Sequence, residues 1–188
     1  MAALRATPNL LVFRPADGKE TAAGWLTALL RGLPTALVLS RQNLPQYAES
    51  GCNAMRGGYV LSESSKGVPD VILMASGSEV EQVIDAQKLL EEKGIAARVV
   101  SMPCMKLFDM QDSEYKESVL PSAVRARVAM EAGSTMPWYK YVGLDGEVLG
   151  IDHYGASAPA AILFKEFGFT AQAVVDAAMR VIKAAPHK

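Results

Sequence analysis

Residues 71–101, VILMASGSEVEQVIDAQKLLEEKGIAARVVS, contain the pattern that decides the fold. The run at residues 71–75 is continuously apolar, as expected for a strand that is buried on both faces of a parallel sheet. Ser78 and Glu81 form an S-x-x-E capping box, which predicts that a helix begins there. Apolar residues recur at helical spacing as far as Leu90, and a second apolar run follows at residues 97–101. A buried strand, a crossover helix and another buried strand predict a parallel βαβ unit.

The sequence on either side of this unit holds enough elements for a complete α/β sandwich at residues 51–188. Further strands are predicted at residues 59–61, 128–132 and 148–151. Helices are predicted at residues 112–118, at residues 160–167 after Ser157 and Pro159, and after the capping residue Thr170.

The first fifty residues predict less than a whole domain. An apolar run at residues 10–13 precedes Asp17, a candidate N-cap for an amphipathic helix. Residues 36–39 then predict a second buried strand, so this part is expected to be a parallel βαβ unit, the remnant of a second α/β domain. Two strands and one helix are too few for a doubly wound sheet, which usually holds ~4–6 strands. Residues 40–58 show no sustained periodicity and are interpreted as an inter-domain linker.

Composition argues against several classes of function. The 188 residues carry 19 Lys and Arg against 20 Asp and Glu, a net charge of −1. We therefore expect no broad basic surface for nucleic acid or for anionic lipid. No apolar run approaches the ~20 residues of a membrane span, and no secretory signal is recognised at the N-terminus. Because Cys52 and Cys104 cannot form a disulfide framework, a cytoplasmic location is expected.

The sequence offers little for a metal or a hydrolase site. The only histidines are His153 and His187, and neither cysteine has a close Cys or His partner of the kind that zinc sites use. No Gly-x-Ser-x-Gly elbow accompanies His153, so this histidine is interpreted as a structural residue at a strand end.

Two strand ends could bind an anion. The loop at residues 76–79 leads into a helix, but the carboxylate of Glu79 would repel a phosphate, and capping explains these residues better. Arg41, in Ser40-Arg41-Gln42, directly follows the strand predicted at residues 36–39, at the carboxyl end where α/β sheets bind ligands. Its guanidinium suits a phosphate or a carboxylate, and a salt bridge across the domain boundary explains it equally well.

Two other groups of residues are interpreted as structural. An acidic run indicates a solvated face, and it consists of Asp109, Asp112, Glu114 and Glu117. An aromatic group lacks the interleaved basic residues of a nucleic-acid platform and indicates packing between domains, and it consists of Trp138, Tyr139 and Tyr141.

Several segments together resemble the C-terminal portion of the transketolase family, in the family's order and over nearly the whole chain. The matching segments are residues 34–45 (PTALVLSRQNLP), 56–60 (RGGYV), 75–80 (ASGSEV), 98–103 (RVVSMP), 115–121 (YKESVLP), 138–143 (WYKYVG), 150–159 (GIDHYGASAP) and 164–170 (FKEFGFT). The resemblance implies that residues 1–50 end a pyrimidine-binding domain with its linker. It also implies that residues 51–188 form the C-terminal domain, a three-layer α/β/α sandwich around a mostly parallel, mixed sheet of about five strands.

The family resemblance also implies a function for the parent protein. Transketolases form homodimers that use thiamine diphosphate and Mg²⁺ (or Ca²⁺) to transfer a two-carbon ketol unit between sugar phosphates in the pentose phosphate pathway. Arg41 matches the family's arginine that contacts the substrate phosphate. The catalytic, cofactor-binding and metal-binding residues of the family match nothing in this sequence, so the chain alone is expected to be inactive.

Two alternatives to a transketolase fragment remain at this point. One is a non-catalytic α/β domain for interaction or dimerisation. The other is a regulatory domain that binds a small ligand at the loop of residues 76–79.

Overall fold

A single mixed sheet organises most of the computed structural model, which describes residues 1–184. Its strand order is β3-β5-β4-β6-β7. The strands are β3 (Tyr59–Ser62), β4 (Val71–Ala75), β5 (Ala97–Ser101), β6 (Arg127–Met130) and β7 (Glu147–Leu149). Only β3 is antiparallel, to β5, and the other pairs are parallel. The predicted five-stranded, mostly parallel sheet is therefore confirmed.

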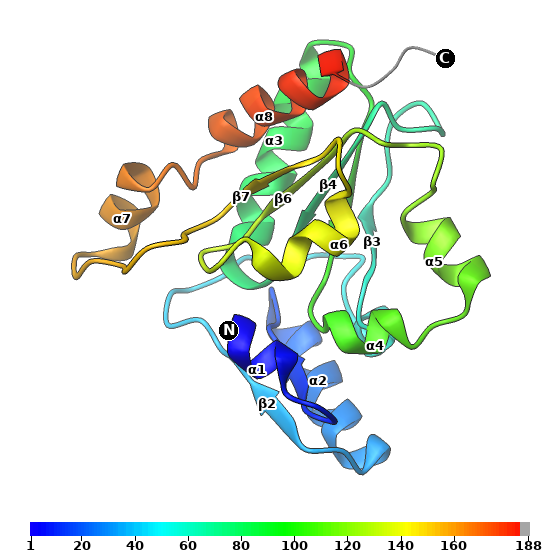
Figure 1. Cartoon of the computed structure of the whole chain (residues 1–188), viewed down its shortest axis with the longest axis vertical. Coiled ribbons are helices and arrows are strands. Elements are labelled where there is room, and N and C mark those ends of the chain that lie inside the picture. Colours follow the sequence, from blue (N-terminus) through cyan, green and yellow to red (C-terminus); the bar gives the residue numbers. More distant parts are fainter. Residues whose placement is uncertain (185–188) are drawn as a thin grey trace.

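Helices cover both faces of this sheet, which confirms the three-layer sandwich (Figure 1). One face packs against α3 (Val80–Glu92) and α8 (Ala171–Ala184). The other face packs against α4 (Met105–Asp109), α5 (Ser113–Val119), the 3₁₀ turn η3 (Met136–Trp138) and α6 (Tyr139–Val142). Along β4, Val71 and Leu73 face the first layer, whereas Ile72 faces the second, so this strand is buried on both sides.

A smaller first unit precedes the sandwich and comprises α1 (Ala2–Ala6), β1 (Leu11–Phe13), α2 (Gly18–Arg31) and β2 (Thr35–Leu37). The strands β1 and β2 pair in parallel, as the predicted βαβ unit requires. The side chain of Asp17 caps α2 by accepting a hydrogen bond from the backbone N–H of Glu20 at 2.8 Å, as predicted. The strand predicted at residues 36–39 begins one residue earlier and ends two residues earlier, because Thr35–Leu37 are the residues in register with Leu11–Phe13.

The first unit packs directly on the sandwich. Leu11 and Phe13 belong to the same buried cluster as Leu73 and Val83. The segment interpreted as a linker contains the 3₁₀ turn η1 (Cys52–Arg56), which packs against α2 and α4. The two parts therefore share one hydrophobic core.

Two predicted helix caps are wrong, although the helix predicted at residues 160–167 begins at Ala160 as expected. Ser78 lies inside the 3₁₀ turn η2 (Gly77–Glu79), and its hydroxyl donates to Glu79 Oε1 instead of capping α3. The helix α7 (Ala160–Glu166) begins after Pro159 without a side-chain cap from Ser157. By contrast, Thr170 caps α8 as predicted, accepting from the Ala173 N–H at 3.2 Å.

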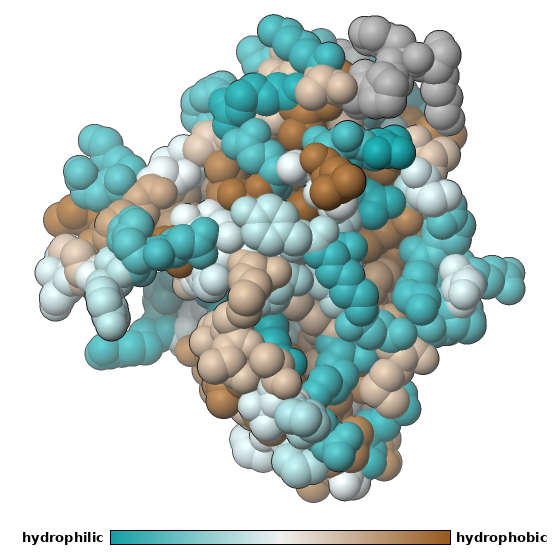
Figure 2. Space-filling model, in the orientation of Figure 1, coloured by the Kyte–Doolittle hydropathy of each residue, from teal (hydrophilic) through white to brown (hydrophobic). Residues whose placement is uncertain are grey.

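The segment that carries α7 stands out from the body of the molecule in both the ribbon and the space-filling view (Figures 1 and 2). Within residues 1–184, none of the helices combines the length and the apolar character needed to cross a membrane.

Candidate functional site

Arg41 follows β2 at the carboxyl end of the two-stranded sheet. The chain continues from β2 in register, because the Val38 N–H donates to the Phe13 carbonyl at 2.9 Å. The side chain of Arg41 is exposed and lines a cavity of about 790 Å³. The opposite wall of this cavity comes from the protruding segment, with Gly155, Pro159 and Phe164 among its residues. Arg41 thus lies at a cavity that the first unit and the sandwich form together.

The guanidinium of Arg41 is not engaged by the rest of the described chain. Over residues 1–184 it takes part in none of the ion pairs, so the salt bridge considered from the sequence is not formed there. Its donors therefore face the cavity or solvent. A free guanidinium of this kind can grip a phosphate or a carboxylate through two parallel hydrogen bonds.

Asp17 and Lys19 fix the far end of the segment that carries Arg41. Besides capping α2, the carboxylate of Asp17 accepts hydrogen bonds from the Tyr47 N–H at 3.1 Å and from the Ser50 hydroxyl. The ammonium of Lys19 donates to the Tyr47 and Ala48 carbonyls at 2.9 and 3.1 Å. Residues 38–50 are consequently anchored at β1 on one side and at the start of α2 on the other.

The loop at residues 76–79 is filled by an arginine of the first unit. Arg14 donates to the Ser76 carbonyl at 2.5 Å and pairs with the carboxylate of Glu79. Gly77 has a φ of +61°, and a Cβ at that position would lie 2.8 Å from Arg14 Cζ. The backbone of the loop is therefore shaped around the guanidinium, which argues against a small-ligand site at this loop.

Glu131 accepts hydrogen bonds from three different parts of the chain. Arg5 donates to its two oxygens at 2.5 and 2.6 Å, the Ser76 hydroxyl at 2.7 Å and Trp138 Nε1 at 3.0 Å. Burial alone would raise the pKa of Glu131, but the hydrogen bond and charge of Arg5 and then the charge of Arg14 hold that pKa below its ordinary value. Glu131 is therefore a buried carboxylate that stays ionised. The sequence pattern places Glu131 only within the strand predicted at residues 128–132, and a carboxylate in so apolar a run is the signal that could reveal its role.

Glu20 is a second buried carboxylate, and its pKa is shifted upward, opposite to that of Glu131. Burial raises its pKa, although the Ser101 hydroxyl at 2.5 Å, the Ala16 N–H at 2.7 Å and the Tyr59 hydroxyl at 2.8 Å favour the ionised form. No cation pairs with Glu20 among residues 1–184. Its contacts join α2 to β3 and β5 and so hold the first unit on the sandwich.

The other candidates from the sequence have structural roles. Asp112, Glu114 and Glu117 are exposed, as the predicted solvated face requires. Asp109 is partly buried, where it accepts from the Tyr141 hydroxyl at 3.0 Å and pairs with Lys140 at 2.8 Å. Trp138 and Tyr141 are buried in the core cluster on the second face of the sandwich, whereas Tyr139 is 57% exposed. The exposed ring of His153 lies against Phe167 at 5.5 Å between ring centroids.

The donor groups of residues 1–184 do not suit a diphosphate–metal site. Within residues 1–184, no three His, Cys, Asp or Glu side chains come together in a way that could hold a metal ion. Of the buried carboxylates near the sheet's carboxyl edge, Glu131 and Glu79 are already paired with arginines. The third, Glu20, accepts hydrogen bonds from the Ala16 N–H and from the Tyr59 and Ser101 hydroxyls.

The fold defines a class of α/β protein whose ligand crevices lie at the carboxyl ends of parallel strands. Residues 57–170 match the family described as "Transketolase-like TK C-terminal domain", and residues 1–46 match "Transketolase, pyrimidine binding domain". The chain belongs to the transketolase family.

Known proteins similar to this chain are consistent with that assignment. This chain is 54% identical to the chloroplastic transketolase of Solanum tuberosum, over 96% of this chain and 25% of that protein. A Leishmania mexicana transketolase structure superposes with a TM-score of 0.91 at 41% identity, covering 99% of this chain and 27% of that one. The structure of a Pichia stipitis transketolase in complex with sedoheptulose-7-phosphate superposes with a TM-score of 0.87 at 44% identity. The match covers 96% of this chain and 26% of that one. The chain thus spans about a quarter of the length of the relatives it matches.

Proposed function

We propose that this chain forms part of a transketolase that transfers a two-carbon ketol unit from a ketose phosphate to an aldose phosphate in the pentose phosphate pathway. We further propose that Arg41 binds the phosphate of the sugar. Membership of the family supports the reaction. The Pichia stipitis relative has been crystallised with a sugar phosphate, which supports the class of substrate.

The unengaged guanidinium of Arg41 on the shared cavity is the observation that carries the proposed role. A phosphate needs charge-assisted hydrogen-bond donors in a fixed geometry. The guanidinium of Arg41 provides such donors at the cavity, and no other described residue pairs with them. The buried Arg14 also lines this cavity, but its charge is offset by Glu79 and Glu131. Arg41 is accordingly the better candidate for a substrate anion.

The test is Arg41→Ala in the complete enzyme, assayed with a phosphorylated donor and with unphosphorylated hydroxypyruvate. Losing hydrogen bonds to a charged group should raise KM for the phosphorylated donor roughly 10- to 100-fold. KM for hydroxypyruvate should stay almost unchanged, because this donor has no phosphate for Arg41 to bind.

Arg31→Ala is the matched control, since Arg31 is an exposed arginine in the last turn of α2 and does not line the cavity. It should leave both donors unaffected. An equal loss with both donors in Arg41→Ala would instead assign Arg41 a structural role.

The cofactor and quaternary structure of the enzyme are also proposals. We propose that thiamine diphosphate and Mg²⁺ (or Ca²⁺) are held by parts of the enzyme other than these residues, that the enzyme is a homodimer, and that it is cytoplasmic. This chain alone should then lack transketolase activity. Calorimetric titration of the chain with thiamine diphosphate and Mg²⁺ should give no saturable heat, and a micromolar site would contradict the proposal.

A further inference from the structure

We propose that the carboxyl end of β6 carries a guanidinium-binding site centred on Glu131, and that Arg5 is its ligand within this chain. The two guanidinium nitrogens of Arg5 donate to the two oxygens of Glu131 at 2.5 and 2.6 Å. Both side chains are almost wholly buried, with 8% and 1% of their surfaces exposed. This parallel, two-bond geometry suits a planar guanidinium and cannot be reproduced by an ammonium.

The site is held in place by residues other than its ligand. The hydroxyl of Ser76, after β4, and Trp138 Nε1, from η3, each donate to one oxygen of Glu131. The ring of Trp138 also lies 5.9 Å from Arg5 Cζ, within the range of a cation–π contact. Because these groups belong to the sandwich, the orientation of Glu131 should persist when Arg5 is removed.

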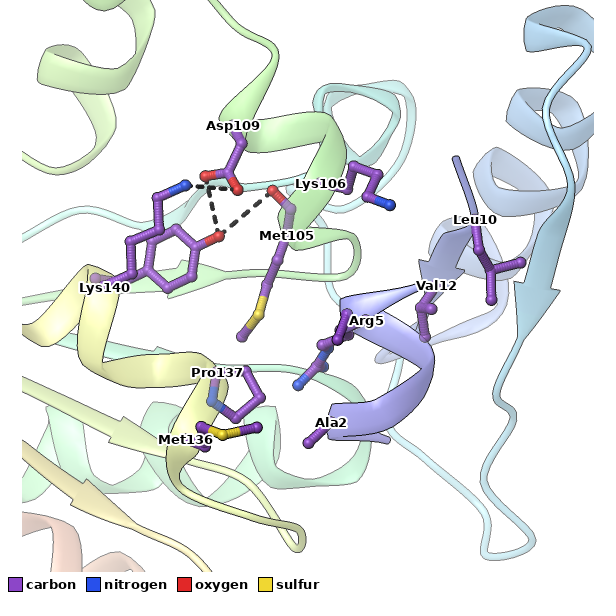
Figure 3. Close-up of a pocket in the computed structure, with 12 residues that line it drawn as sticks. Ala2, Arg5, Leu10, Val12, Met105, Lys106, Asp109, Met136, Pro137 and Lys140 are labelled. Atoms are coloured by element: carbon purple, nitrogen blue, oxygen red, sulfur yellow. Dashed lines mark hydrogen bonds and ion pairs between the residues drawn. The ribbon is translucent and has the colours of Figure 1, made fainter. Parts of the chain in front are cut away.

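A cavity of about 230 Å³ adjoins the ligand and provides an entrance (Figure 3). Figure 3 shows Arg5 extending from α1 toward Met105, Met136 and Pro137, which line this cavity with largely apolar surface. Arg5 Nε is buried and has no hydrogen-bond partner among residues 1–184. Truncation of Arg5 would therefore join the cavity to Glu131 and leave space for a guanidinium-sized cation.

The two lysines of this cavity are engaged elsewhere and do not replace Arg5. Lys106 donates to the Thr7 carbonyl at 2.7 Å, and Lys140 pairs with Asp109 at 2.8 Å. In addition, no residue of α1 other than Arg5 has a buried side chain, so Arg5 is the deep contact that fastens this helix to the sandwich. The site around Glu131 therefore selects a guanidinium group, and in this chain Arg5 of α1 supplies it.

Chemical rescue of Arg5→Ala in the full chain tests this inference. Thermal unfolding is followed at 0–50 mM methylguanidinium chloride, with methylammonium chloride at equal concentration as the reference salt. Methylguanidinium should raise the Tm of Arg5→Ala saturably, by about 3–6 °C at tenfold excess over its Kd, and methylammonium should not.

Arg180→Ala is the matched control, because Arg180 also forms a two-bond pair, with Glu147, but on the exposed surface. Neither the wild type nor Arg180→Ala should show a specific rise. The rescue should also disappear in Arg5→Ala/Glu131→Gln. The inference is overturned if Arg5→Ala shows no guanidinium-specific rise, or if Arg180→Ala shows the same one.

If Arg5→Ala does not fold, nitrogen-15 NMR of the arginine side chains in the wild-type chain gives the answer. Arg5 should show separate, slowly exchanging Nη–H signals because its rotation is blocked by Glu131, whereas Arg180 should show averaged ones. Averaged signals for Arg5 would equally overturn the inference.

Discussion

The first unit and the sandwich differ in how they obtain a hydrophobic core. In the sandwich, β4 is completely buried between two layers of helices. In the first unit, β1 and β2 form a sheet of only two strands, and α2 leaves Trp25, Leu29 and Leu30 58%, 79% and 68% exposed. The first unit therefore depends on the sandwich for its core, although it carries the proposed phosphate ligand Arg41.

Buried polar contacts reinforce this dependence. Glu20 of α2 bonds to Tyr59 and Ser101 of the sandwich, and Arg14 fills the loop after β4. A buried polar group that loses its partner is strongly unfavourable, so these contacts favour one docked arrangement of the two parts. The position of Arg41 relative to the sandwich should follow from this docking.

Separation of the two parts should have the largest effect. We expect residues 51–188 alone to remain folded, because the sandwich keeps all five strands of its sheet. Residues 1–50 alone should be unfolded, since a two-stranded sheet is marginal at best in water and so short a chain buries little surface. Circular dichroism and amide NMR of the two pieces would measure this difference. Cooperative melting of residues 1–50 would disprove the dependence.

Asp17→Ala should cause the next largest loss of folding stability. It removes an N-cap together with the hydrogen bonds to Tyr47 and Ser50, so the free energy of unfolding should fall by about 2–4 kcal/mol. In the sandwich, Asp112 only caps α5, through the Tyr115 N–H, and Asp112→Ala should cost about 0.5–1 kcal/mol. Urea unfolding of both variants makes the comparison. Equal losses would show that Asp17 does not clamp the segment bearing Arg41.

The smallest effect should be a difference in pH dependence between Glu131 and Glu20. The lowered pKa of Glu131 means that its contribution to stability is present above about 4.5, the ordinary value, and is lost as the pH falls through the lowered pKa. The raised pKa of Glu20 has the opposite sign, because its contribution is greatest below that ordinary value and is lost as the pH rises through the raised pKa.

Urea unfolding of Glu131→Gln and Glu20→Gln between pH 3 and 8 separates the two contributions. Glu131→Gln should flatten the loss of stability on the acid side, whatever its cost at neutral pH. Glu20→Gln should become more stable relative to the wild type as the pH rises. Slopes that change in the same direction in both variants would refute these assignments.

The sheet is predicted well from the sequence because each strand is a short apolar run that can be recognised from neighbouring residues alone. The predicted bounds of β4 and β5 agree with the structure, since both are continuous apolar runs with clear ends. Ser78 does not form the predicted cap, because the left-handed backbone of Gly77 turns the chain around Arg14, a residue distant in sequence.

The buried charges could not be predicted from local patterns. Arg5 and Glu131 are 126 residues apart, and nothing near either residue indicates the other. Arg41 could be assigned to a strand end, but only the folded chain shows that its guanidinium stays free among the described residues and faces a cavity shared with the sandwich.

The most direct test of the proposed site is a crystal structure of the complete enzyme with sedoheptulose 7-phosphate bound. We predict that two phosphate oxygens lie about 2.7–2.9 Å from the guanidinium nitrogens of Arg41, in the cavity between the first unit and the protruding segment. A phosphate held by other residues, with Arg41 turned away into solvent, would contradict the assignment.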